Sequence, residues 1–218
     1  QKKCLGKMGD VAGEGRTVLF VSHNMAAIRK LCEKSILLSA GRKVFFGSSK
    51  NCIDYYLNSQ NENDYEIIEH ISFQSPMLRI DNIKVNNQKT DKLVLRKDDN
   101  TLMINIGGMC FQNLNLDLEA QIEDIFGTVL GFYSPAHMRG YANVVEEGCF
   151  SLDWKIRMPD RMTKGDYIVN IKLADPNKNF WLDIPKALRL SYEGYPTDTG
   201  RIIEYRSGVG WILLEDDS

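Results

Sequence analysis

The sequence predicts a mainly β protein, an antiparallel β-sandwich of the immunoglobulin-like or jelly-roll kind, preceded by a short α/β segment. From about residue 72 onward, apolar and polar residues alternate with period two, and Gly, Pro, Asn or Asp separates one alternating segment from the next. Before residue 60, a β-branched apolar run is followed by apolar residues at helical spacing. This change of periodicity predicts an α/β unit at 1–58, a polar linker at 59–71 and a sandwich at 72–218.

Composition and charge are those of an ordinary globular protein and exclude several other classes. Of the 218 residues, 43% are hydrophobic and 26% charged, and no apolar run approaches the roughly 20 residues that cross a bilayer. Residues 61–218 carry 17 Lys and Arg against 25 Asp and Glu, an acidic balance that disfavours nucleic-acid binding. The five cysteines are widely spaced, with no Cys-x-x-Cys pair, so we expect reduced, mostly buried thiols and no bound metal.

The first unit is predicted as a strand, a helix, a hairpin and a second helix. Thr17–Val21 is a continuous apolar run, the pattern of a strand buried on both faces of a parallel sheet. A polar triplet ends this run, and residues 25–34 then show helical spacing. Apolar runs on both sides of an Ala-Gly pair predict a hairpin over 35–47, and helical spacing resumes over 53–57.

The residues of this unit resemble a known family. Gly15-Arg-Thr-Val-Leu-Phe-Val-Ser-His23-Asn24-Met25, a helix, and then Ile36-Leu-Leu-x-x-Gly41-x-x-x-x-x-Gly47 are similar to the final stretch of an ABC-transporter nucleotide-binding domain. Within that superfamily, these motifs followed by an all-β extension most resemble the ATPase subunits of O-antigen polysaccharide exporters of the Wzt type. The resemblance implies that His23 is the switch histidine, which contacts the γ-phosphate of ATP. The alternative is a histidine that merely connects strand and helix.

The motifs that would make the fragment an ATPase by itself do not occur in it. There is no Gly-x-x-x-x-Gly-Lys-Ser/Thr phosphate loop, and hence no nest of backbone amides for the phosphates of ATP. The family's Leu-Ser-Gly-Gly signature and the strand with its catalytic acidic residue would lie upstream of Gln1. We therefore expect no catalytic residue, metal or cofactor in this fragment, whereas the resemblance implies ATP and Mg²⁺ for the full-length parent.

The strands of the sandwich follow from the alternation. Leu116–Ile122 alternates most regularly, and its polar positions, which include Asp117 and Glu119, are predicted to form a solvated face with Gln121 and Glu123. The other predicted strands are Leu78–Val85, Thr101–Cys110, Val129–Tyr133, Phe150–Met158, Tyr167–Ala174, Leu188–Tyr192, Ile202–Tyr205 and Trp211–Leu214.

Two aromatic residues are predicted to belong to the scaffold. Met162-x-x-Gly165-x-Tyr167 resembles the tyrosine corner of immunoglobulin-type sandwiches. Trp154 shares the apolar parity of its strand, so we expect it in the core and not at a sugar.

The β region also resembles the carbohydrate-binding C-terminal domain of the same exporters. Asp124-Ile-Phe-Gly127-Thr-Val-Leu-Gly131-Phe, a loop, and a strand leading to Met162-x-x-Gly-x-Tyr carry this resemblance. It implies a sandwich that recognises the finished end of the polysaccharide and couples it to export, often as a dimer that exchanges terminal strands.

Three segments place aromatic and polar residues off the core parity, as sugar recognition requires. They are the irregular loop 134–143, the turn 175–183 and the turn-rich stretch 192–198. The respective alternatives are a solvated connector, an aromatic lid on the end of the sandwich and the hinge of an exchanged strand. The candidate carbohydrate-binding residues are Tyr133, His137, Arg139, Tyr141, Asn143, Phe180, Trp181 and Tyr195.

Together these observations predict a binding module without enzyme activity: the cytoplasmic carbohydrate-binding part of an O-antigen ABC exporter, which recognises the completed, terminally modified polysaccharide. The implied partners are the O-antigen polysaccharide, a second copy in a homodimer and the transmembrane permease of the exporter. The start Gln1-Lys-Lys-Cys4 lacks the features of a signal peptide, so we expect a cytoplasmic fragment of a longer chain, peripheral to the inner membrane.

Two other functions remain open. The sandwich could serve only to dimerise the ATPase subunits, which a bare terminal strand at Trp211–Leu214 would favour. It could also be a glycan hydrolase with a carboxylate pair drawn from Asp117, Glu119, Glu123 and Asp153.

Overall fold

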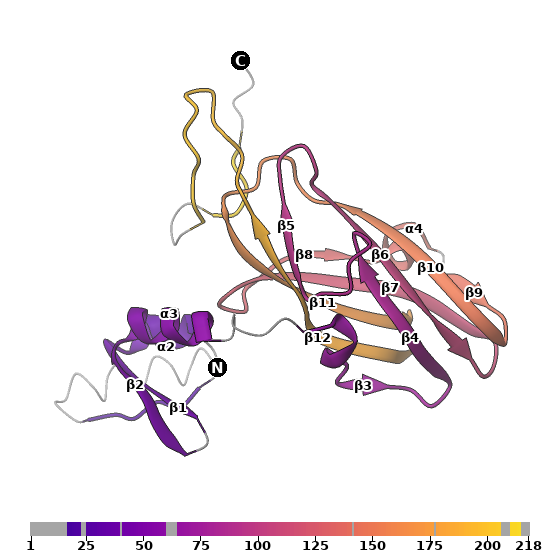
Figure 1. The fold of residues 1–218 in the computed structure, drawn as a ribbon, viewed down its shortest axis with the longest axis horizontal. Helices are drawn as coiled ribbons and strands as arrows, with labels where there is room; N and C mark the ends of the chain where they lie inside the picture. The colour runs from indigo at the N-terminus through magenta and orange to yellow at the C-terminus, as the bar shows by residue number, and fades with distance from the viewer. Residues whose placement is uncertain are drawn as a thin grey trace. The chain divides into compact units, whose positions relative to one another are not determined.

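The computed structural model describes residues 17–22, 25–39, 41–59, 65–140, 142–176, 178–205 and 210–214 (Figure 1). Its contacts divide the chain into two compact units, residues 1–63 and 64–218, which are described separately below. Within the described ranges, no helix is long and apolar enough to cross a membrane.

The first unit contains helix α2 (Met25–Leu31), the hairpin of β1 (Lys34–Ser39) and β2 (Arg42–Ser48), and helix α3 (Ser49–Ser59). The hairpin turns at Gly41, whose φ of 74° is readily adopted by glycine. Stacking of Phe45 on Tyr55, with ring centroids 5.0 Å apart, holds α3 against β2. The predicted order of helix, hairpin and helix is therefore confirmed.

The strand predicted at Thr17–Val21 is wrong, because this segment has no regular secondary structure. Leu19 and Val21 are 87% and 96% exposed. A strand buried on both faces needs hydrogen-bonded neighbours on both sides, and no described strand pairs with this segment. His23, the switch histidine implied by resemblance, lies outside the described residues.

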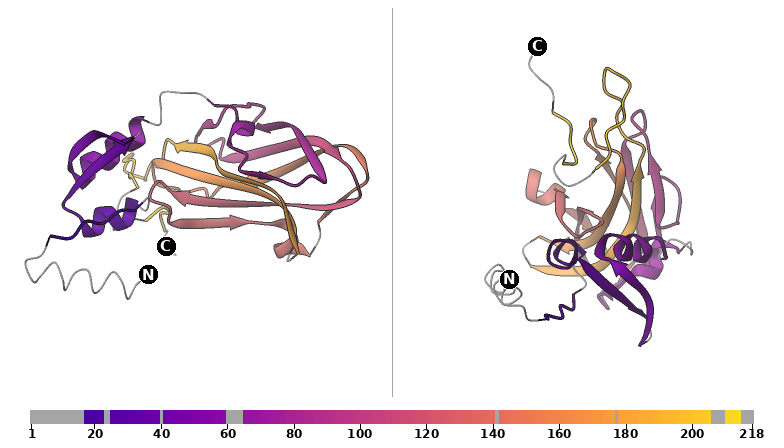
Figure 2. Two further views of the ribbon diagram at one scale, coloured as in Figure 1. Left: turned by 90° about the horizontal axis from the view of Figure 1, so that it is seen from below. Right: turned by 90° about the vertical axis from the view of Figure 1, so that its left-hand side faces the viewer.

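The second unit is a sandwich of two sheets that face each other as layers (Figure 2). The smaller sheet has the order β10-β6-β4, and the larger has the path β3-β12-β11-β7-β8, with β5 beside β12 and β9 beside β7. Apart from the parallel pair of β5 and β12, the described ladders are antiparallel. The strands are β3 Phe73–Gln74, β4 Leu78–Val85, β5 Lys92–Leu95, β6 Thr101–Cys110, β7 Leu114–Asp124, β8 Val129–Tyr133, β9 Asn143–Val145, β10 Gly148–Arg157, β11 Gly165–Asp175 and β12 Asn179–Tyr192.

The core lies between these two sheets and follows the predicted alternation. Ile104 and Ile106 of the small sheet, and Leu118, Val169 and Ile171 of the large sheet, are at most 1% exposed. Each such side chain contributes roughly 1.5–3 kcal/mol by leaving water. The predicted antiparallel β-sandwich is thus confirmed.

Residues 67–70, which the sequence assigns to the linker, form a short 3-10 helix (Ile67–His70) of the second unit. Ile67 is fully buried in the core cluster, and its amide donates to the carbonyl of Lys89 at 2.8 Å. His70 Nε2 lies 2.9 Å from a carboxylate oxygen of Asp91. Ile68 and Ile71 also pack against this core, so the sandwich begins before residue 72.

Two scaffold predictions are confirmed. Tyr167 is completely buried, and its hydroxyl donates to the carbonyl of Thr163 at 2.8 Å, as a tyrosine corner requires. Trp154 is 6% exposed and belongs to the core cluster.

The strands predicted at Ile202–Tyr205 and Trp211–Leu214 are wrong, because these segments make only isolated bridges, from Glu204 to Lys164, from Ile202 to Pro196 and from Ile212 to Met162. Lys164 exchanges backbone hydrogen bonds with Ile203 and Tyr205, while Thr163 donates to Trp211. In contrast, the strand predicted at Leu188–Tyr192 is longer than expected, and β3, β5 and β9 are not predicted at all.

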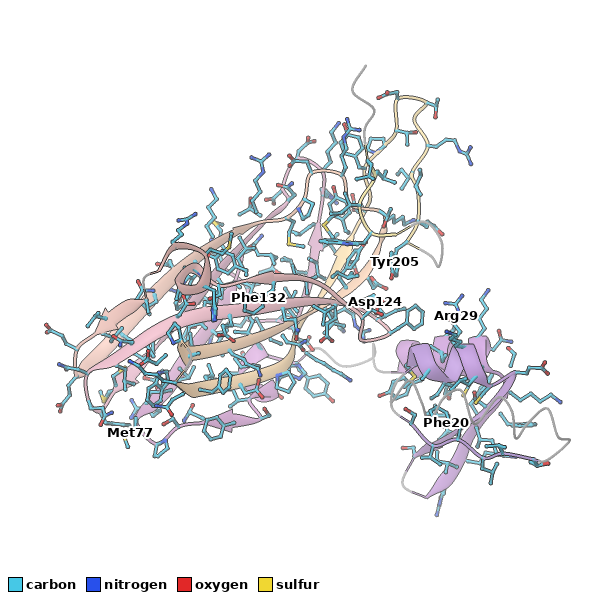
Figure 3. All side chains as sticks on the ribbon, turned by 180° about the vertical axis from the view of Figure 1, so that it is seen from behind. Phe20, Arg29, Met77, Asp124, Phe132 and Tyr205 are labelled. Atoms are coloured by element: carbon cyan, nitrogen blue, oxygen red, sulfur yellow. The ribbon has the colours of Figure 1, made fainter. Side chains whose placement is uncertain are left out.

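Tyr205 ties this C-terminal segment to the sandwich, since its hydroxyl donates to Asp124 Oδ2 at 2.7 Å (Figure 3 labels both residues). Burial, and then the neighbouring Asp124 carboxylate, raise the pKa of Tyr205 above its usual value of 10.0. The unfolded chain therefore releases this proton at a lower pH than the folded chain. The contribution to stability is complete below about pH 10 and falls as the pH rises further.

The expected result is a smaller alkaline loss of stability in Tyr205→Phe than in the unsubstituted chain, measured as thermal midpoints between about pH 8 and pH 11. Equal slopes for the two chains would show that Tyr205 is not held protonated by Asp124.

Candidate binding pocket

A pocket of about 230 Å³ lies at one end of the sandwich. Three segments of the chain meet there: the turn between β6 and β7, the short strand β9, and the hairpin turn between β11 and β12. Its lining residues are Gln112, Asn113, Leu114, Asn115, Val144, Asp175, Asn179 and Trp181.

Strand pairing explains why these distant residues lie together. β9 pairs with the start of β7, which puts Val144 opposite Asn115. β11 and β12 close their hairpin with Asp175 opposite Asn179. A register shift next to Leu173 then changes the alternation of β12, so that Trp181 reaches the pocket while Leu182 stays in the core.

Trp181 is the aromatic wall of the pocket. Its Nε1 donates to the carbonyl of Asn115 at 3.0 Å, and the partly buried ring packs against the core cluster. The hydrogen bond and the packing fix the ring in place and leave no free indole donor. Trp181 can therefore contribute ring surface to a ligand, but no further hydrogen bond.

Asp175 is the one carboxylate of the lining. Its side chain is 15% exposed, and Oδ2 receives two long hydrogen bonds, 3.5 Å from Asn115 Nδ2 and 3.4 Å from Lys178 Nζ. No described residue donates to Oδ1 of this carboxylate. A strong acceptor is thus available at a site where the competing bonds are weak.

The lining combines groups suited to a polyhydroxylated ligand. Four amide side chains, each with donors and an acceptor, surround the carboxylate, and an indole ring and Val144 supply apolar surface. Hydroxyl groups of a sugar both donate and accept, and its C–H faces pack on aromatic rings. Among the described residues, no cluster of three or more His, Cys, Asp or Glu is arranged to hold a metal ion.

Of the residues predicted for the site, Trp181 lines the pocket. It also packs on the end of the sandwich, so the binding and the lid interpretations both describe part of its environment. Asn143 is next to the lining residue Val144, but its own amide donates to the carbonyl of Leu116 at 3.3 Å. Tyr141 lies outside the described residues.

The other predicted residues lie away from the pocket lining. Phe180 is 54% exposed, with Lys172 Nζ 4.8 Å from its ring centre. Tyr195 lies between two cations, with Lys97 Nζ at 4.9 Å and Arg161 Cζ at 5.1 Å from the ring centre.

The segment 134–143 is predicted to be irregular, but it contains helix α4 (Pro135–Arg139). His137 and Arg139 are exposed on this helix, and Tyr133, which precedes it, is half-buried. Ser134 caps this helix, accepting from the amide of His137 at 3.2 Å and donating to Asp117 Oδ2 at 2.6 Å. A capped Ser-Pro start is a helix signal that the polar composition obscured.

The prediction that Asp117 is solvated is therefore wrong. Asp117 has the outward parity of β7, but the start of α4 covers it and leaves the residue 0% exposed. Oδ2 also accepts from the amide of Ala136 at 3.2 Å. Burial here follows from a helix packed on the sheet, which alternation cannot predict.

The sequence-based interpretation missed most of the lining. Gln112, Asn113 and Asn115 follow a predicted strand and read as ordinary turn residues, and Asp175 and Asn179 lie in a predicted candidate turn without having been singled out. The one available signal was the density of amide side chains from 112 to 115, which exceeds what a tight turn needs.

Comparisons with known proteins give partial relatives. No family model matches the chain. The teichoic acids export ATP-binding protein TagH of Bacillus anthracis is 34% identical over 55 residues, 25% of this chain and 10% of that protein. The O-antigen export system ATP-binding protein RfbB of Klebsiella pneumoniae is 38% identical over 56 residues, 26% of this chain and 23% of that protein.

The matched stretch spans less than a quarter of the length of each of these curated relatives. The predicted resemblance to ATP-binding subunits of polymer exporters is confirmed. Among solved structures, the C-terminal domain of Wzt matches 67% of this chain and 87% of its own, with 12% identity and a TM-score of 0.44.

Proposed function

We propose that this chain is part of the ATP-binding subunit of an O-antigen exporter, and that its β-sandwich binds the polysaccharide. The observation that carries the proposal is the pocket, in which four amides, one carboxylate and an indole converge. The relatives are named for export of O-antigen and of teichoic acids, and this supports a cell-envelope polymer as the ligand.

In the full-length protein, this binding would couple recognition of the completed polymer to ATP-driven export. ATP and Mg²⁺ would then be cofactors of the whole subunit, and a membrane permease and a second copy of the subunit would be its partners. The sandwich itself acts by binding, with the polysaccharide released unchanged.

The carboxylates considered for a hydrolase are poorly placed for catalysis. Asp117 is fully buried and bonded to Ser134. Asp153 lies on the small sheet, where Oδ1 accepts from Asn105 at 2.9 Å, whereas Glu119 and Glu123 belong to the large sheet. A glycosidase needs two carboxyl groups on either side of one bond, roughly 5–10 Å apart.

The purely structural alternative rested on a bare terminal strand at 211–214. Ile212 makes one isolated bridge to Met162, and Trp211 packs against the core, so this segment offers no open ladder edge. Dimerisation by another surface is compatible with glycan binding.

Calorimetry with lipid-free O-polysaccharides, native and end-trimmed, tests the proposal. We expect saturable binding without release of sugar. A folded chain that binds none of the polysaccharides would contradict it, and a stable dimer in the same sample would then favour the structural alternative.

A further inference from the structure

The polar lining of the pocket contains no cationic side chain. Its hydrogen-bonding residues are Gln112, Asn113, Asn115, Asn179 and Asp175, so every side-chain donor is a neutral amide. Among described residues, Lys178 is the one cation with a recorded contact to a lining residue. Its Nζ lies 3.4 Å from Asp175 Oδ2 and its side chain is 66% exposed, so it makes a weak ion pair from outside the lining.

Phosphate groups are bound in proteins chiefly by arginine and lysine, or by several free backbone amides at a helix start or a nest. The pocket offers neither a lining cation nor a helix start. Two backbone groups beside it are engaged, since the Asn115 carbonyl accepts from Trp181 and the Glu147 amide donates to Asn113 Oδ1 at 3.0 Å. A phosphate entering the pocket would be repelled by the carboxylate of Asp175, whose charge is offset only by the long contact with the exposed Lys178.

Hydroxyl groups, unlike phosphate, find suitable hydrogen-bond partners in the pocket. Asp175 accepts charge-assisted hydrogen bonds from hydroxyls, which are about twice as strong as bonds between neutral groups. Asn179 is exposed and has no recorded side-chain hydrogen bond, so its amide is available to a ligand. The indole of Trp181 then covers an uncharged C–H face.

From these contacts we infer that the pocket selects uncharged, hydroxyl-rich segments of a glycan and rejects segments that carry phosphate. The inference rests on the proposed function and names the chemical class of its ligand. It also assigns Asp175 as the residue that determines this selectivity.

An array of bacterial polysaccharides tests this selectivity, with neutral glycans, phosphate-bearing glycans and poly(glycerol phosphate) printed side by side. The strongest hits are expected among neutral glycans, with poly(glycerol phosphate) bound at least about tenfold more weakly, a difference of about 1.4 kcal/mol. Trp181→Phe is run beside it to show that the hits use the pocket.

Two substitutions then change the charge of the pocket. Asp175→Asn keeps the shape and should weaken the best neutral hit about tenfold, whereas Asp98→Asn, at an exposed carboxylate in the turn after β5, should leave it unchanged. Asn179→Lys adds a free cation and should raise binding of poly(glycerol phosphate) several-fold.

The outcomes separate the two proposals. A phosphate-bearing glycan among the strongest hits, with binding that Trp181→Phe weakens, would overturn the inference and leave the proposed function standing. An array without any hit would overturn both. Asp175→Asn with unchanged neutral binding would show that Asp175 does not determine selectivity.

Discussion

Trp181→Ala is expected to weaken polysaccharide binding by about thirtyfold, because it removes the one aromatic wall of the pocket. The ring is held by its hydrogen bond to Asn115 and by the core, so a ligand meets it without prior ordering. Calorimetry or affinity electrophoresis with the best native polysaccharide measures the change.

The same substitution could also loosen the end of the sandwich, so folding has to be checked by thermal denaturation. Asn179→Ala gives an independent measure, since Asn179 lines the pocket and its side chain has no recorded intramolecular hydrogen bond. We expect that variant to weaken binding about fivefold at unchanged stability. Phe73→Ala, at an exposed aromatic of β3, is the matched control and should bind normally. Normal binding by both pocket variants would show that the polysaccharide does not bind in this pocket.

Gly108→Ala is expected to destabilise the sandwich by about 3 kcal/mol or to prevent its folding. A Cβ on Gly108 would lie 1.9 Å from the carbonyl oxygen of Arg79, a backbone atom that cannot move without breaking the ladder between β4 and β6. The cause is a bulge in β4 between Ile80 and Asn82, which brings the backbone of β4 over β6.

Gly107→Ala is the control for this prediction. A Cβ there would lie 3.3 Å from the carbonyl oxygen of Phe150, which needs a shift of only a few tenths of an ångström. Denaturant unfolding should therefore show a cost of about 1 kcal/mol or less for Gly107→Ala. If both variants unfold at the same denaturant concentration, the close approach of β4 to Gly108 is not present in solution.

Strands with one buried and one solvated face could be predicted from the sequence. β4, β6 and β8 coincide with their predicted ranges, and the core parity is clearest along β6, where Leu102, Ile104 and Ile106 are buried. The bulge in β4 explains why Ile80 and Ile83, which have opposite parity, are both buried. Short edge strands such as β9 have too few residues to show a period.

The pocket could not be predicted because its residues meet only through long-range pairing. Asn115 and Trp181 are 66 positions apart, and Asn115 and Asp175 are 60 apart. Their contact depends on the order of β9, β7, β11 and β12 in the sheet, which local patterns do not determine. The same holds for Asp117, whose burial depends on a helix that begins at Pro135. Trp181 is predicted because it lies just past a turn, where a ring can be exposed.

The central claim is that a glycan binds against Trp181, and the indole N–H signals of the three tryptophans test it most directly. In a ¹⁵N-labelled chain titrated with the best native polysaccharide, we expect the Trp181 signal, identified with Trp181→Phe, to shift and to saturate. The signals of Trp154, buried in the core, and of Trp211, packed beside Gly131, should remain in place. Saturable binding that shifts the Trp211 signal, or none of the three signals, would show that the glycan does not bind against Trp181.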